Sequence, residues 1–173
     1  MGTVVAHAAR SDRFMELSGN AMIAVSPEQG VPLKRLLEAQ LAAFYKQVDV
    51  SGPEVVLDPA PALSFATVIN ELAVNAARYG ALSVATGKVS VHWTVDEKSH
   101  LSTLLFLWQE TGGRRVASRT SSESDGANIE AVAQELGKIR ISYASGGLKY
   151  EMEIPLDEVR FHKQKGGSEN EPL

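Results

Sequence analysis

The chain has 173 residues, of which 44% are hydrophobic and 22% charged, and its formal net charge is -4. These values suit a soluble globular chain with one sizeable core and argue against a general nucleic-acid binder, which carries a basic face. No apolar run reaches the roughly 20 residues that span a bilayer, so no membrane segment is expected. The absence of cysteine excludes disulfides and thiolate metal sites and agrees with a cytoplasmic location.

The first third of the chain is predicted to be mostly helical. Residues 1–31 form an N-terminal extension with at most a remnant helix over 13–25. A second helix is expected from Pro32, because proline suits a first helical turn, to about Tyr45. Its apolar residues recur at helical spacing, which indicates one face packed on a core.

Two short strands, over 48–50 and 54–57, come next and are expected to form a hairpin-like pair. Pro59 then opens a long helix that runs to Tyr79, with Gly80 as its C-terminal cap. This helix is mostly apolar or small along its whole length, which predicts a position deep in the fold.

The second half is predicted to contain two strand pairs and one short helix, over residues 88–95, 101–108, 127–136, 138–143 and 148–154. Trp93 and Trp108 lie on the first pair and are expected to pack in the same core layer. Residues 110–127 are poor in apolar side chains and read as a long loop, which in a compact domain is usually functional or mobile. The polar residues 157–173 are expected to be a disordered tail.

This order of elements predicts an α+β fold. The expected architecture is a two-layer sandwich, with a mixed β-sheet and helices on one of its faces. Residues 32–156 would form the single domain between the extension and the tail.

The long helix carries three polar residues on one stripe. Glu71 and Asn75 are four residues apart, and Arg78 follows three later. Ionisable groups are expensive to bury without a partner, so a metal ion and an anionic ligand would explain them. A Glu-x-x-x-Asn pair by itself is more often two incidental polar residues of a core helix. Its interpretation therefore depends on the residues around it.

The segment Asn-Glu-Leu-Ala-Val-Asn-Ala-Ala-Arg-Tyr-Gly-Ala-Leu-Ser, residues 70–83, resembles the N-box of sensor histidine kinases. It is most similar to the HWE subgroup and its sister group, within the Bergerat-fold ATPases. The resemblance implies that Asn75 coordinates a Mg²⁺ ion bridging the ATP phosphates and that Glu71 is catalytic, as orienting group or base. Arg78 would lie near phosphate, and Tyr79 would pack beside it.

The segment Trp-Gln-Glu-Thr-Gly-Gly that begins at Trp108 resembles the first glycine box of the same subgroup. The resemblance implies that Glu110 hydrogen-bonds the adenine amino group. Gly112 and Gly113 would let the backbone approach the nucleotide. The string is weak alone, but it follows the N-box at the family's spacing, and the similarity extends over about residues 31–156.

Three features depart from the subgroup. Its signature histidine before the N-box glutamate is Asn70 here. The second glycine box, over 121–128, keeps one glycine, Gly126, and adds two carboxylates, which would repel phosphate. The phosphoacceptor motif is absent around His7, so the accepting histidine is expected outside this chain segment. Arg114, Arg115 and Arg119, in the loop, either contact phosphate or are solvated.

The resemblance therefore implies the ATP-binding catalytic domain of a two-component sensor histidine kinase, with ATP and Mg²⁺ as cofactors. The expected partner is a response regulator or a histidine-bearing dimerisation domain, and a homodimer is possible. One alternative is a degenerate module that has lost catalysis and acts through protein–protein contacts. Another is an anti-sigma-type regulator, which shares the fold, although the Trp-x-Glu-x-Gly-Gly string favours the histidine kinase branch.

Overall fold

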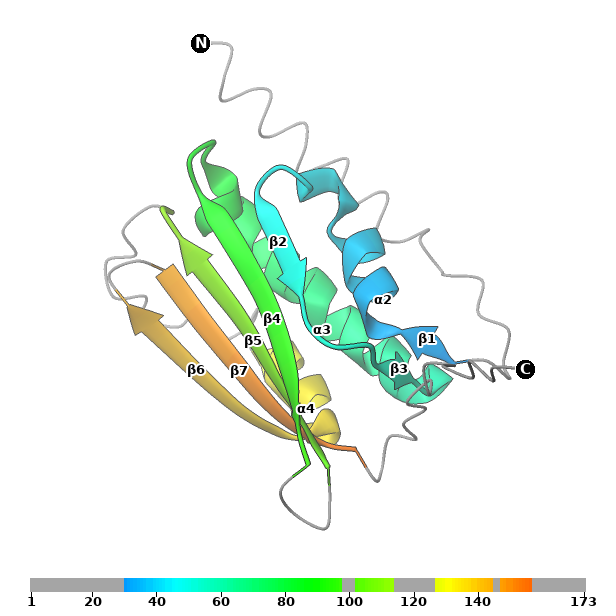
Figure 1. The fold of residues 1–173 in the computed structure, drawn as a ribbon. Helices are drawn as coiled ribbons and strands as arrows, with labels where there is room; N and C mark the ends of the chain where they lie inside the picture. Colours follow the sequence, from blue (N-terminus) through cyan, green and yellow to red (C-terminus); the bar gives the residue numbers. More distant parts are fainter. Residues whose placement is uncertain (1–29, 98–101, 114–126, 145–146, 157–173) are drawn as a thin grey trace, which may run out of the picture.

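A five-stranded mixed sheet organises the computed structural model, which describes residues 30–97, 102–113, 127–144 and 147–156. The strand order is β2-β4-β5-β7-β6, with β2 parallel to β4 and every other neighbouring pair antiparallel (Figure 1). The strands are β2 (Val48–Ser51), β4 (Lys88–Asp96), β5 (Thr103–Thr111), β6 (Lys138–Ala144) and β7 (Gly147–Pro155). A separate two-stranded sheet joins β1 (Val31–Pro32) to β3 (Val56–Leu57).

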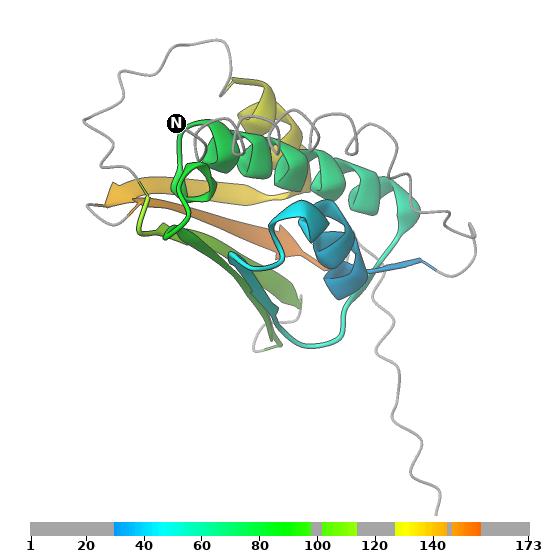
Figure 2. The same cartoon turned by 90° about the horizontal axis from the view of Figure 1, so that it is seen from above.

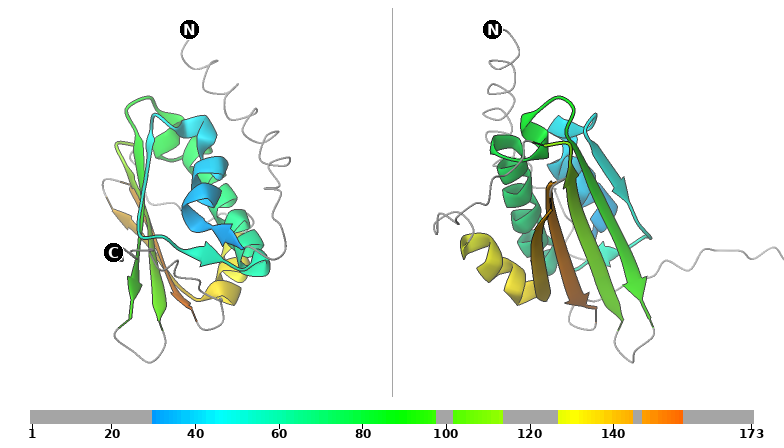
Figure 3. Two further views of the ribbon diagram at one scale, coloured as in Figure 1. Left: turned by 45° about the vertical axis from the view of Figure 1, so that its right-hand side comes forward. Right: turned by 90° about the vertical axis from the view of Figure 1, so that its left-hand side faces the viewer.

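The helices lie on one face of the five-stranded sheet (Figure 2). They are α2 (Leu33–Gln40), α3 (Pro59–Arg78) and α4 (Ala127–Leu136), with short 3₁₀ turns η1 (Ala42–Phe44) and η2 (Ala81–Ser83). The helix α3 occupies the middle of this layer and contacts both α2 and α4 (Figure 3). The two layers confirm the predicted α+β sandwich with helices on one face.

The position of α3 follows from its sequence. Its buried residues recur around more than one side of the helix: Ala62, Phe65, Val68, Ile69, Leu72, Ala73, Val74 and Ala76. Pro59 occupies the first turn, where a backbone N–H would have no intrahelical partner in any case. At the other end the N–H of Gly80 donates to the carbonyl groups of Ala76 and Asn75.

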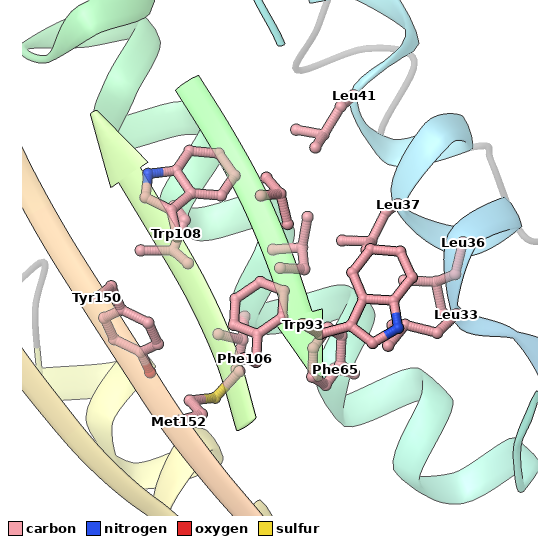
Figure 4. Packing of buried hydrophobic residues seen from close by; sticks show 14 of the residues in the cluster. Leu33, Leu36, Leu37, Leu41, Phe65, Trp93, Phe106, Trp108, Tyr150 and Met152 are labelled. Carbon is pink, nitrogen blue, oxygen red and sulfur yellow. The ribbon is translucent and has the colours of Figure 1, made fainter. Parts of the chain in front are cut away.

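The core between the layers is built on the inward-facing positions of three strands. Trp93 on β4, Phe106 and Trp108 on β5, and Tyr150 and Met152 on β7 are all buried and face the helices (Figure 4). The ring of Phe106 also meets Phe65 of α3 edge-on, with centroids 5.0 Å apart. The expectation that both tryptophans pack in one core layer is confirmed.

The predicted hairpin over 48–50 and 54–57 is wrong. The first strand joins β4 in parallel, whereas the second pairs with β1 in the other sheet. The connection between them packs on Trp93, whose indole N–H donates to the carbonyl of Pro53 at 2.9 Å. Gly52 lies so close to the same indole that a Cβ there would collide with it. These contacts fix the connection beside Trp93, and the chain continues into β3 of the other sheet.

One further predicted boundary changes. The helix expected from Pro32 to about Tyr45 ends at Gln40, and the chain continues as the 3₁₀ turn η1. The path of the chain from η1 into β2 is fixed by Gln47, whose buried side-chain amide donates to the carbonyl groups of Val84 and Gly87. Such long-range side-chain contacts cannot be read from the local pattern.

The predicted extension over 1–31 lies outside the described residues except at its end, where Val31 is buried in β1, and the predicted tail over 157–173 lies outside them. Within the part of the chain that is described, no helix is long and apolar enough to cross a membrane.

Candidate functional site

The polar stripe of α3 is present as predicted. Glu71 and Asn75 are partly buried, Arg78 is exposed, and Tyr79, just after the helix, is 44% exposed. The carbonyl of Asn75 accepts the N–H of Tyr79 at 2.9 Å, so Asn75 lies one turn before the end of the helix. Glu71 and Asn75 are therefore not the deeply buried polar groups that the sequence suggested, but side chains at the boundary between core and solvent.

The buried acid of this region is Glu110, near the end of β5. Its side chain is only 5% exposed. One carboxylate oxygen, Oε2, accepts the backbone N–H of Ala81 at 2.7 Å, and the other, Oε1, accepts the indole N–H of Trp108 at 3.3 Å. Burial raises the pKa of the Glu110 carboxyl, while the hydrogen bonds from Ala81 and Trp108 act in the opposite direction.

Glycines allow this carboxylate to approach the end of α3. A Cβ at Gly80 would collide with Oε2 of Glu110. Gly80 follows the last turn of α3 and its N–H bonds to carbonyl groups of that turn, as expected of a cap, but its φ of -103° is not left-handed. Its missing side chain also provides the space that the glutamate occupies.

The predicted glycine box packs against the same segment. A Cβ at Gly113 would lie 3.0 Å from Cα of Ala81. Gly112 has a φ of +68°, in the left-handed region that favours glycine, and it faces the carbonyl of Thr86. The structure thus brings Glu110 and Gly113 onto the Gly80–Ala81 segment, which directly follows Arg78 and Tyr79, and places Gly112 against Thr86 and Gly87.

Gly126 and the loop arginines lie outside the described residues, so their predicted contacts with phosphate stay predictions. Asn70, which replaces the subgroup's histidine, is partly buried on α3. Its Oδ1 atom is buried and has no hydrogen-bond partner within the described ranges.

Sequence reasoning missed three members of this site, Gly80, Ala81 and Trp108. Gly80 was expected to be only a helix cap and Trp108 only a core residue. A signal was present for Trp108, because residues two apart on a strand point to the same face, which places its indole beside Glu110. No comparable signal pointed to the N–H of Ala81, which comes from a segment 29 residues earlier in the chain.

The donor set suits a magnesium ion held largely by a ligand's own oxygens. No group of three or more His, Cys, Asp or Glu residues that could hold a metal occurs within the described segments. Mg²⁺ commonly takes only one or two protein ligands, together with phosphate oxygens and waters. A partly exposed amide at Asn75, one turn after the carboxylate of Glu71, fits that pattern.

An open groove also lies on the face of the sheet away from the helices. It includes His92 of β4, Leu105 and Leu107 of β5, and Arg140 of β6. None of the predicted site residues lines it, so it is separate from the site at the end of α3.

Two curated relatives align with most of the chain. A blue-light-activated histidine kinase from Erythrobacter litoralis is 31% identical over 117 residues, which cover 65% of this chain and 31% of the relative. A blue-light-activated histidine kinase from Brucella anthropi is 30% identical over 154 residues, 84% of this chain and 31% of the relative. The chain therefore matches less than half the length of either relative. No family model matches it.

The fold is also that of a solved histidine kinase domain. The histidine kinase domain of a blue-light-activated kinase from Erythrobacter litoralis superposes with a TM-score of 0.63 at 17% identity. The match covers 88% of this chain and 76% of that domain. By sequence and by fold, the chain is therefore similar to the catalytic domains of histidine kinases.

Proposed function

We propose that this chain binds Mg-ATP at the C-terminal end of α3 and donates the γ-phosphate to a histidine outside this chain segment. The observation that carries the proposal is the packing of Glu110 and Gly113 on the Gly80–Ala81 segment, immediately after the stripe of Glu71 and Asn75. A carboxylate acceptor, glycine backbone and a metal-binding amide thus lie along one continuous part of the fold.

Each residue has a distinct proposed role. Asn75 is the metal ligand, and Glu71 orients or deprotonates the attacking group. Arg78 and Tyr79 lie beside the phosphates, which Gly126 would also approach. Magnesium would supply charge neutralisation on the phosphate oxygens, which matters because phosphoryl transfer depends mainly on positioning and electrostatic stabilisation.

The adenine base of ATP would be recognised at the end of β5. An ionised glutamate is a pure acceptor, so Glu110 would accept the amino group of adenine. Gly112 and Gly113 would allow the backbone to approach the ring. The flanking Trp108 is fully buried, so it supports this strand end from inside the core.

The wider assignment is a two-component sensor histidine kinase in the cytoplasm, with residues 32–156 as its ATP-binding domain. The relatives support it by their names. The partner would be a response regulator or a histidine-bearing dimerisation domain, and a homodimer would follow from the latter.

Calorimetric titration of Mg-ATP into the native chain and an Asn75→Ala variant tests the site. Thr67→Ala is a matched control, because Thr67 is exposed on the same helix and its hydroxyl donates to the carbonyl of Leu63, away from the proposed site. We expect binding by the native chain and the control, and its loss in Asn75→Ala. Absence of binding by the native chain at millimolar nucleotide would refute the catalytic proposal.

That negative result would favour the second candidate, a histidine-kinase-like module that acts through protein contacts alone. One feature favours it: the segment over 121–128 has a single glycine and two carboxylates where phosphate-binding glycines are expected. Carboxylates beside a triphosphate oppose its binding.

A further inference from the structure

The carboxylate of Glu110 keeps unused acceptor positions. Each of its oxygens accepts one protein donor, the N–H of Ala81 on Oε2 and the indole N–H of Trp108 on Oε1. An ionised carboxylate has about four acceptor positions, so this leaves capacity for a donor from a ligand. The group is thus held from two sides without being saturated.

Its orientation is also fixed sterically. Gly80 leaves no space for more than a hydrogen atom beside Oε2. A Cβ at Gly147 would lie 2.5 Å from the backbone oxygen of Glu110, so the first residue of β7 packs closely on the backbone of Glu110. Rotation of the carboxylate would break both hydrogen bonds inside the protein, where unpaired donors are expensive.

The two hydrogen bonds also influence protonation. Burial raises the pKa of Glu110, and the donors from Ala81 and Trp108 counteract that rise by stabilising the charged form. The charge state decides what the group can recognise. An ionised carboxylate only accepts, whereas a protonated one can also donate to a carbonyl oxygen.

Resting on the proposed function, we propose that Trp108 is a positioning residue that sets the preference of the site for a 6-amino purine over a 6-oxo purine. It does so by keeping Glu110 in one orientation as a pure acceptor. Adenine presents an amino donor to that acceptor. Hypoxanthine presents a carbonyl at the same place, which leaves two acceptors facing each other.

The plainer explanation is that Trp108 only fills the core, and Trp93 provides the matched control. Both tryptophans are fully buried on adjacent strands, and both indole N–H groups form a hydrogen bond. The partner of Trp93 is the carbonyl of Pro53 in the β2–β3 connection. Replacing either tryptophan by phenylalanine removes one indole and one hydrogen bond, but only the change at Trp108 touches Glu110.

The experiment measures the affinities of Mg-ATP and Mg-ITP, which differ at the purine 6-position, for the native chain, Trp108→Phe and Trp93→Phe. We expect the preference for ATP over ITP to fall about three- to tenfold in Trp108→Phe, the effect of losing one long hydrogen bond to a charged group. Trp93→Phe should keep the native ratio. An unchanged ratio in Trp108→Phe, with ATP still bound, would overturn this inference and leave the proposed function intact. Failure of the native chain to bind either nucleotide would overturn both.

A second measurement needs no change near Glu110. In Trp93→Phe the remaining indole N–H signal in an NMR spectrum belongs to Trp108, because the chain has only two tryptophans. We expect this signal to move when ATP is added, and to move less with ITP at equal saturation. Only adenine has an amino group that donates to the Glu110 carboxylate, which also accepts the indole N–H of Trp108. A signal that responds equally to both nucleotides would contradict the inference even if Trp108→Phe does not fold.

Discussion

Glu71 and Glu110 are both assigned to one nucleotide site, yet their surroundings differ. Glu71 is partly exposed on α3 and has no hydrogen-bond partner among the described residues. Glu110 is buried and joins β5 to the segment after α3. We infer that the first can be changed with little effect on the fold, whereas the second connects binding to stability. The four predictions below test this difference, starting with the largest effect.

Replacing Glu110 by alanine should lower the free energy of unfolding by about 3 kcal/mol. The change leaves the N–H of Ala81 and the indole N–H of Trp108 without their acceptor and opens a cavity. Urea denaturation followed by tryptophan fluorescence measures it. Glu110→Gln, which keeps one acceptor and the side-chain volume, should lose less. A fully native stability in the alanine variant would show that the carboxylate does not hold the two segments together.

Replacing Glu71 by glutamine should lower activity and leave stability almost unchanged. We expect phosphoryl transfer from ATP to a histidine-bearing dimerisation domain to fall by at least about 100-fold, because general-base and orienting groups contribute that much. The free energy of unfolding should change by less than about 0.5 kcal/mol. Radiolabelled transfer and urea denaturation check the two parts, with Thr67→Ala as the control on the same helix. Equal losses of stability in Glu71→Gln and Glu110→Gln would remove the contrast.

Replacing Gly80 by alanine should lower the free energy of unfolding by about 2 kcal/mol, because the new methyl group collides with Oε2 of Glu110. The clash predicts coupling between the two positions. In a double-mutant cycle, Gly80→Ala should be less harmful on top of Glu110→Ala than in the native chain. Additive losses would mean that the penalty arises elsewhere, for example from Ala76, which also faces the added Cβ.

The smallest effect is a dependence of stability on pH. Because burial raises the pKa of Glu110 in the folded chain above its ordinary value, the folded state holds this proton more tightly than the unfolded state. Its contribution is fully present below the ordinary pKa of a glutamate and is lost as the pH rises through the folded-state pKa. The native chain should therefore lose stability over that window relative to Glu110→Gln, and parallel curves of stability against pH would contradict this.

The sequence predicted the layers well because their signals are local. Alternation on β4 and β5 and the apolar surface of α3 reflect which face of each element is buried, and the structure agrees. The stripe of Glu71, Asn75 and Arg78 likewise needed only helical spacing. These features are fixed by residues within a few positions of each other.

What sequence reasoning missed depends on contacts between distant segments. The hairpin prediction over 48–57 failed because Trp93, some 40 residues later, holds the connection. The same limit hid the bond from Ala81 to Glu110 and the close approach of Glu110 to Gly80. In both cases a glycine marks the place where another part of the chain comes close, but its sequence position does not say which part.

The parallel pairing of β2 with β4 has a consequence for how the domain folds. This pairing closes a loop of the chain that contains the whole of α3. Hydrogen bonds from the side chain of Gln47 to the carbonyl groups of Val84 and Gly87 join the two sides of this closure. Such non-local contacts are formed only after the entropy of closing the loop has been overcome, so they slow folding. The segment that supplies the N–H of Ala81 lies just inside this closure. We therefore expect the Ala81–Glu110 contact to be assembled late, and refolding of the core to precede recovery of nucleotide binding.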